Sequence, residues 1–186
     1  MNSYIPVIGE ITAETFKEYT LAAYQDQQAL VVISGPGGDI GYTLAMLDDI
    51  DYKKRTTFAT GICQSSAAVL ATAGEGRRIC TMDTLFRFLK PSHETEAVSD
   101  YDHFLHSVFV ARLAARLKCE RVEIEDIFDG EFISSIRAQQ LGLIDEVIST
   151  GELNGNPSGL SGSESGSDSQ AQRALGSYRL ESDDSA

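Results

Sequence analysis

The stretch VVISGPGGDIGYTLAMLDDI, residues 31–50, contains the pattern that decides the fold class. An apolar run of strand length leads into a glycine-rich turn, and apolar residues at helical spacing follow. A continuous apolar run is typical of a strand that is buried on both faces of a parallel sheet. The same succession recurs from residue 57, where TFATGIC precedes a run of small residues that ends at Gly74.

The remaining elements extend this alternation of strands and helices. We expect strands at 4–9, 77–82 and 84–89, and a helix at 12–26 that Thr12 caps. A long helix is predicted at 95–118. Its expected apolar stripe consists of Val98, Tyr101, Phe104, Leu105, Val108 and Leu117. This order predicts an α/β fold with a mainly parallel sheet and a long helix in its second half.

Composition divides the chain and restricts its partners. Residues 1–150 form the predicted domain, whereas 151–186 contain nine Ser and six Gly and are expected to be a disordered acidic tail. The net charge of −13 disfavours nucleic acid and anionic membranes as partners. No signal segment or membrane span is expected, nor any metal or cofactor. Three widely spaced cysteines, Cys63, Cys80 and Cys119, favour a reducing compartment such as the cytoplasm, or a host's cytoplasm if the protein is virus-encoded.

Two loops at the carboxyl ends of predicted parallel strands are candidates for a site. In the first, SGPGG (34–38), Gly37 and Gly38 allow a sharp turn with exposed N–H groups. The second leads into Ser65 at the start of a helix. If the loops are adjacent, the amides of Gly38 and Ser66 can face an oxyanion on a carbonyl that Ser65 attacks. The alternative is that both loops are only tight strand-to-helix turns.

These motifs carry a family resemblance. The stretches 31–50 and 57–86, with IGEITAETF (8–16) and SSIRAQQLGLIDEVI (134–148), resemble ClpP, the proteolytic subunit of the ATP-dependent Clp protease, whose fold is shared with the crotonases. The resemblance implies that Ser65 is in the position of the nucleophile. It also implies that the glycine pair (Gly37 and Gly38) and the amide of Ser66 form the oxyanion hole, and that the chain assembles with ClpP-like subunits and an AAA+ unfoldase.

ClpP-like peptidases use a catalytic triad of serine, histidine and aspartate, and this chain departs from the family at the histidine and aspartate positions. When the chain is aligned on Pro91, the family's histidine falls on Leu89, and the aspartate falls on Gly130, with Asp129 and Glu131 on either side. Leucine cannot accept a proton, yet a serine hydroxyl needs a base. His93 is a possible substitute base and Asp129 a possible orienter of it. Lys90 is disfavoured because strand alternation directs it away from the face of residue 89.

Three functions follow as alternatives. The first is a ClpP-like subunit, in a homo-oligomer or a mixed ring, that is weak or inactive by itself because it lacks the base. The second is an active ATP-dependent serine endopeptidase subunit that uses His93. The third is a crotonase-type acyl-CoA enzyme. The short segment 90–100, where the family has a substrate-clamping handle, also speaks against efficient cleavage of long substrates.

Overall fold

The structure is a computed structural model that describes residues 3–90 and 100–149. The possible base His93 and the expected tail, 151–186, lie outside these residues. The elements are β1 (Tyr4–Ile11), α1 (Ala13–Gln25), β2 (Leu30–Gly38), α2 (Ile40–Lys53), β3 (Thr57–Gln64), α3 (Ser66–Thr72), β4 (Arg78–Thr81), β5 (Leu85–Leu89), α4 (Asp100–Leu117), α5 (Arg121–Ile127), β6 (Asp129–Ser134), α6 (Ser135–Gln140) and β7 (Glu146–Ile148).

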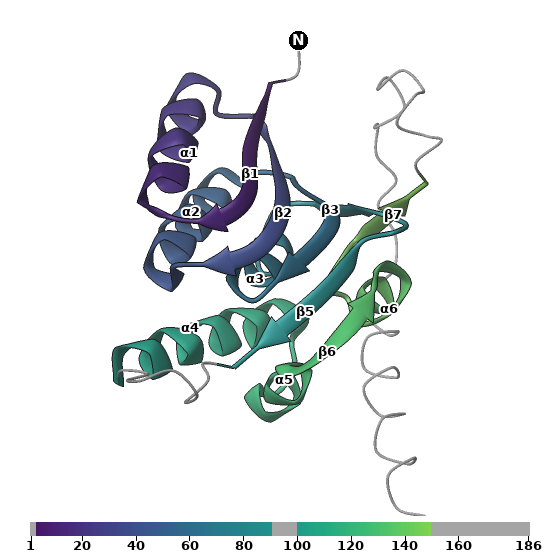
Figure 1. The fold of residues 1–186 in the computed structure, drawn as a ribbon. Helices are drawn as coiled ribbons and strands as arrows, with labels where there is room; N and C mark the ends of the chain where they lie inside the picture. Colours follow the sequence, from purple (N-terminus) through teal and green to yellow (C-terminus); the bar gives the residue numbers. More distant parts are fainter. Residues whose placement is uncertain (1–2, 91–99, 150–186) are drawn as a thin grey trace, which may run out of the picture.

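The strands form one mainly parallel sheet, which confirms the predicted fold class. Its path runs β1-β2-β3-β4-β7, and every pair along this path is parallel. Besides β2, strand β3 has two further partners: its first half pairs with β4 and its last residues pair with β5. Strand β6 pairs with β5 in the antiparallel sense. Strands β5 and β6 therefore extend away from the group of β1, β2, α1 and α2, beside α5 and α6 (Figure 1).

Local sequence explains where the first two helices begin. Thr12 Oγ1 accepts a hydrogen bond from Thr15 N (3.3 Å), and Asp39 Oδ1 accepts one from Tyr42 N (2.8 Å). Both side chains satisfy amides that have no partner within the first helical turn. The predicted cap at Thr12 is thus confirmed, and Asp39 caps α2 in the same way.

Strand β2 is longer than the sequence pattern predicts. The expected strand ends at Ser34, but β2 continues through the glycines to Gly38. The reason is the neighbouring strand: after an irregularity between Ile8 and Glu10, β1 pairs again with β2 at Gly37 and Gly38. The glycine loop is therefore held by the sheet along its whole length.

The expected apolar stripe of the long helix is partly wrong. Phe104 is 62% exposed, whereas Leu105, Phe109 and Leu113, spaced four residues apart, are buried. This face of α4 packs near α5, which the sequence reading did not anticipate. The predicted stripe also included Val98, which lies outside the described residues.

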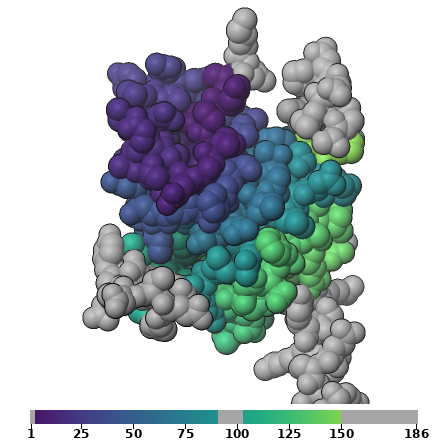
Figure 2. Space-filling view, in the orientation of Figure 1, coloured from purple at the N-terminus to yellow at the C-terminus, as the bar shows by residue number. Residues whose placement is uncertain are grey.

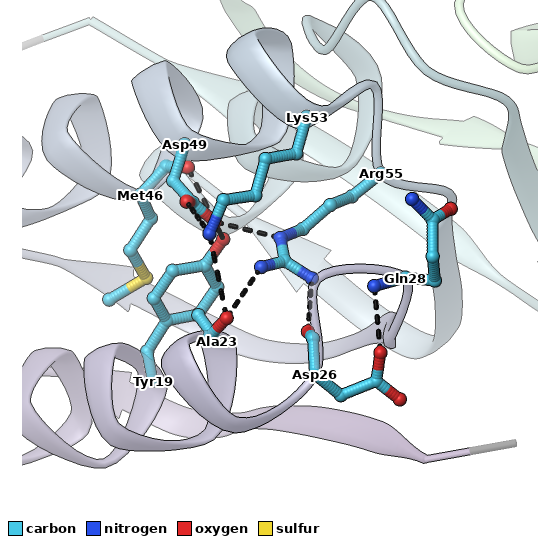
Figure 3. Close-up of polar contacts among 8 residues, drawn as sticks. All are labelled: Tyr19, Ala23, Asp26, Gln28, Met46, Asp49, Lys53 and Arg55. Atoms are coloured by element: carbon cyan, nitrogen blue, oxygen red, sulfur yellow. Dashed lines mark hydrogen bonds and ion pairs between the residues drawn. The ribbon is translucent and has the colours of Figure 1, made fainter.

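A buried arginine joins the two helices that flank the glycine loop (Figure 3). Arg55 donates to Asp49 Oδ2 (2.7 Å) and to the carbonyl oxygens of Ala23 in the last turn of α1 and of Asp26, which caps α1 (2.9 Å each). Tyr19 also donates to Asp49 Oδ2 (2.8 Å). The guanidinium thereby supplies short hydrogen bonds to carbonyl oxygens at the end of a helix, which lack partners within the helix.

Two further findings apply to the described residues. No helix there has both the length and the apolar composition that a membrane crossing needs. No group of three or more His, Cys, Asp or Glu side chains in residues 3–90 and 100–149 is placed to hold a metal ion.

Candidate active site

Ser65 occupies a strained turn between β3 and α3. Its φ and ψ are 49° and −126°, a conformation that is uncommon for a residue with a side chain. The turn is held by the backbone: Ser65 N donates to the carbonyl oxygen of Arg87 on β5 (2.8 Å). The hydroxyl makes no hydrogen bond to any described residue. A strained strand-to-helix turn of this kind presents a serine at the edge of a sheet.

The structure brings the glycine loop and the serine turn together. A Cβ atom built on Gly37 would lie 3.0 Å from Ser65 Cβ and 3.0 Å from Ser66 N. Ser66 Oγ donates to the carbonyl oxygen of Gly38 (3.1 Å), which links the loops directly. With φ at +98°, and with no room for a side chain, position 37 requires glycine. Backbone amides therefore lie close to the serine, an arrangement that can stabilise negative charge on a bound carbonyl oxygen.

Leu89 and Gly130 also lie side by side. Leu89 is the last residue of β5 and is paired in register with Asp129 at the start of β6. A Cβ atom on Gly130 would lie 3.4 Å from Leu89 Cδ2, which is ordinary van der Waals contact. Gly130 has φ at +89°, so its backbone conformation itself favours glycine. Leu89 and Gly130 thus form a corner between β5 and β6. The side chain of Leu89 and the hydrogen atom that Gly130 has in place of a side chain cannot transfer a proton.

Other acids and bases near β5 are engaged elsewhere. Asp129 Oδ1 accepts from Glu131 N (2.8 Å) and stabilises its own turn. Lys90 Nζ lies 3.6 Å from Glu125 Oε2, and His106 Nε2 lies 3.4 Å from the same oxygen. The His106 ring also packs edge-on against Phe128 with centroids 4.7 Å apart. Both side chains are therefore directed to α5.

Sequence reasoning missed Arg87. Its Nε donates to the carbonyl oxygen of Gly130 (2.5 Å), and its guanidinium carbon lies 5.2 Å from the centre of the Phe132 ring. The guanidinium thus lies beside the corner formed by Leu89 and Gly130. A signal was present in LFRFL (85–89), where one charged residue interrupts an otherwise apolar strand.

The thiols cannot replace the serine as nucleophile. Burial raises the pKa of Cys63 to about 12 and that of Cys80 to about 11, so both remain protonated at neutral pH. Both side chains are free and buried. Among the described residues, Ser65 is the remaining candidate for covalent chemistry at the carboxyl ends of the strands.

Comparison with known proteins agrees with the fold and with the order of these motifs. The sequence profile described as Clp protease matches residues 6–151. The chain belongs to the Clp protease family. This family consists of ClpP-like serine proteases, and the fold of the chain is ClpP-like, as the resemblance implied.

Two relatives show the extent of the similarity. The ATP-dependent Clp protease proteolytic subunit 1 of Salinibacter ruber is 28% identical over 136 residues, a match that covers 66% of this chain and 58% of that subunit. The chain therefore spans less than two thirds of the length of this curated relative. The crystal structure of the ClpP protease catalytic domain from Plasmodium falciparum has a TM-score of 0.69 and 25% identity, and the match covers 79% of this chain and 85% of that one.

Proposed function

We propose that the chain is a ClpP-like subunit of a Clp-type proteolytic assembly that keeps the serine and its oxyanion loops but hydrolyses peptides weakly or not at all by itself. In this proposal Ser65 is in the nucleophile position, and Gly37, Gly38 and Ser66 line the oxyanion hole. Leu89 and Gly130 occupy the positions of the missing histidine and aspartate. The subunit would then contribute peptide binding, without efficient hydrolysis, to the assembly.

The contact between Leu89 and Gly130 carries the proposal. The resemblance assigns the base and its acidic partner to these two positions, and in the structure a side chain on Gly130 would touch Leu89. Two triad positions that were identified separately along the sequence are therefore neighbours in space, which supports the alignment. A serine protease that loses its whole triad loses on the order of a millionfold in rate, although an oxyanion hole preserves some activity.

Labelling with a fluorophosphonate probe tests this proposal. Because the probe reports serine nucleophilicity, the wild-type chain should be labelled at a rate close to that of Ser65→Ala. Ser66→Ala is a less suitable control because its hydroxyl links the two loops. Rapid labelling that depends on Ser65 would contradict the proposal. If His93→Ala then abolished it, the active-peptidase alternative would replace the proposal.

We further propose that the subunit works in a homo-oligomer or a mixed ring with ClpP-like subunits, with an AAA+ unfoldase as a possible partner. Strand β1 buries Ile5 and Val7 on its inner face but leaves Tyr4 (65%) and Ile8 (57%) exposed on the other. Ile62 on β3 and Leu85 on β5 are also exposed. Figure 2 shows the first and second halves of the described chain as one continuous body. Apolar side chains that this body leaves exposed are candidates for contact with a neighbouring subunit.

Light scattering after size-exclusion chromatography tests assembly. The wild-type chain, alone or mixed with a ClpP-like paralogue, should elute as an oligomer. Ile8→Lys should shift it toward monomer, whereas Val122→Lys, at an exposed position on α5, should not. A monomer at micromolar concentration under both conditions would refute assembly. The free buried thiols support a reducing compartment, and we propose the cytoplasm as the location.

A further inference from the structure

We infer that Arg87 and the apolar residues around it form a binding site for the carboxylate at the end of a peptide whose last side chain is apolar. This inference rests on the proposed function, because a site that binds without cleaving can retain a chain end. It adds to that proposal the chemical class of the ligand and the residue that recognises it.

Arg87 lacks the kind of partner that most arginines of the described chain have. Arg55, Arg77, Arg78, Arg112 and Arg116 each form an ion pair with an aspartate or glutamate. Arg87 has no carboxylate at ion-pair distance among the described residues, although the chain carries a net charge of −13. Asp129, next to Gly130, does not fill this role, and its Oδ1 instead accepts from Glu131 N.

The guanidinium is held in place, and some of its donors have no partner among residues 3–90 and 100–149. Nε is committed to the carbonyl oxygen of Gly130 (2.5 Å), and the Phe132 ring lies against the guanidinium plane with its centre 5.2 Å from Cζ. Neither Nη atom has a hydrogen-bond partner among the described residues, and Arg87 is partly exposed with respect to them. Two adjacent Nη atoms match the two oxygens of a carboxylate and can bind it in a bidentate manner.

The surroundings favour a chain end with an apolar side chain. Arg87 shares its strand face with Leu85, and Leu85 pairs in register with Ile62 on β3. Leu85, Ile62 and Phe132 are all partly exposed, at 37%, 46% and 49%. A carboxylate on the guanidinium therefore places the last side chain of a peptide over apolar surface. A bulky acid at position 130 would occupy the same space, since a Cβ there would lie 3.9 Å from Arg87 Nη2.

The site also lies next to the serine turn. The carbonyl oxygen of Arg87 accepts the hydrogen bond from Ser65 N (2.8 Å), and Gln64 pairs in register with Arg87. A peptide that enters beside Ser65 therefore meets the guanidinium on the adjacent strand. Where a complete triad would cleave the chain, this arrangement retains its carboxyl end.

Fluorescence anisotropy with labelled pentapeptides tests the inference on the full chain. The probes are a peptide that ends in leucine with a free carboxylate, the same peptide as a C-terminal amide, and a C-terminal amide that ends in glutamate. Hydrogen bonds to charged groups predict about tenfold to hundredfold tighter binding of the free acid than of the leucine amide. Arg87→Gln should remove this preference, whereas Arg121→Gln, which removes the same charge from the exposed start of α5, should retain it.

Three results would overturn the inference. They are equal binding of free acid and leucine amide by the wild-type chain, an unchanged preference in a folded Arg87→Gln variant, and binding of the glutamate amide as tight as that of the free acid. The comparison of acid with amide uses the wild-type chain and does not depend on whether the variant folds. Mass spectrometry of the recovered peptides distinguishes failure of this inference from failure of the proposed function. Cleavage of the peptides that depends on Ser65 would contradict the proposed function. Absence of a preference for the free carboxylate would contradict only the binding site at Arg87.

Discussion

Restoring a base next to Ser65 tests the proposed function most directly. Leu89→His places an imidazole on the strand whose Arg87 carbonyl oxygen binds Ser65 N. Leu89 is paired in register with Asp129, so the single variant already has a carboxylate opposite it, although that carboxylate now accepts from Glu131 N. Gly130→Asp adds a second acid at a position where a Cβ atom would touch Leu89. The double variant should therefore regain nucleophilicity at Ser65.

The structure indicates how much stability the double variant Leu89→His/Gly130→Asp should lose. Gly130 has φ at +89°, so an aspartate there is strained by roughly 1–2 kcal/mol. Leu89 is half-buried, and its replacement by histidine costs about 1 kcal/mol. At about 2–4 °C per kcal/mol, the melting temperature of the double variant should fall by roughly 4–12 °C. Assays at 20 °C therefore still measure the folded protein.

The expected gain is in the rate of fluorophosphonate labelling. General base catalysis contributes about 10²–10⁴-fold, and the double variant should gain at least the lower value relative to wild type. The rate should rise with pH around the ordinary imidazole pKa of about 6.5, because the neutral ring is the base. Adding Ser65→Ala should abolish the gain. If a folded double variant is labelled no faster than wild type, Leu89 does not face Ser65 and the alignment at this position is wrong.

Four other predictions follow from the same structure. Arg55→Met removes one of the three side-chain donors to Asp49 and the Arg55 hydrogen bonds to the carbonyl oxygens of Asp26 and Ala23, so it should lower the free energy of unfolding by about 3 kcal/mol, measured by urea denaturation. Lys17→Met, which breaks an exposed ion pair, should change the same free energy by less than about 0.5 kcal/mol. Burial would raise the pKa of Asp49, but hydrogen bonds from Lys53, Arg55 and Tyr19 outweigh it and hold this pKa below its usual value. The stability that this ionisation contributes is present above about pH 4 and is lost as pH falls through the folded-state pKa, so the difference in melting temperature between wild type and Asp49→Asn should narrow below about pH 4. Gly37→Ala introduces a Cβ atom 2.8 Å from the carbonyl oxygen of Gln64, at a residue with φ at +98°. It should lower the free energy of unfolding, measured by calorimetry, by roughly 2–4 kcal/mol. An unchanged melting temperature would show that the two loops are not in contact. Removal of residues 151–186 should leave the melting temperature nearly unchanged, because a Ser/Gly-rich acidic segment buries little apolar surface, and a drop of several degrees would show that it packs on the domain.

Much of the fold was predictable because it depends on neighbours in the sequence. The caps at Thr12 and Asp39 are such features, since a side chain binds an amide three residues further along. The mainly parallel sheet was equally predictable, because the order of apolar strands and amphipathic helices restricts how strands can pair. The family resemblance added the position of the serine and pointed to Leu89 and Gly130.

Tertiary structure decided the features that depend on strand pairing and on packing between distant elements. Strand β1 extends β2 through Gly38, a pairing that the sequence of β2 alone does not contain. On α4, Phe104 is exposed and Phe109 is buried, because the elements that pack on a helix decide which of its apolar residues are buried. The contacts that position Arg87 come from β6, which supplies the Gly130 carbonyl oxygen and the Phe132 ring from more than forty residues further along the chain. The sequence by itself thus determined the alternation of strands and helices up to β5 and the places of Ser65, Leu89 and Gly130 along the chain. The pairing of β5 with β6 decided which residues lie together beside the serine turn, because contacts between distant residues leave no local pattern.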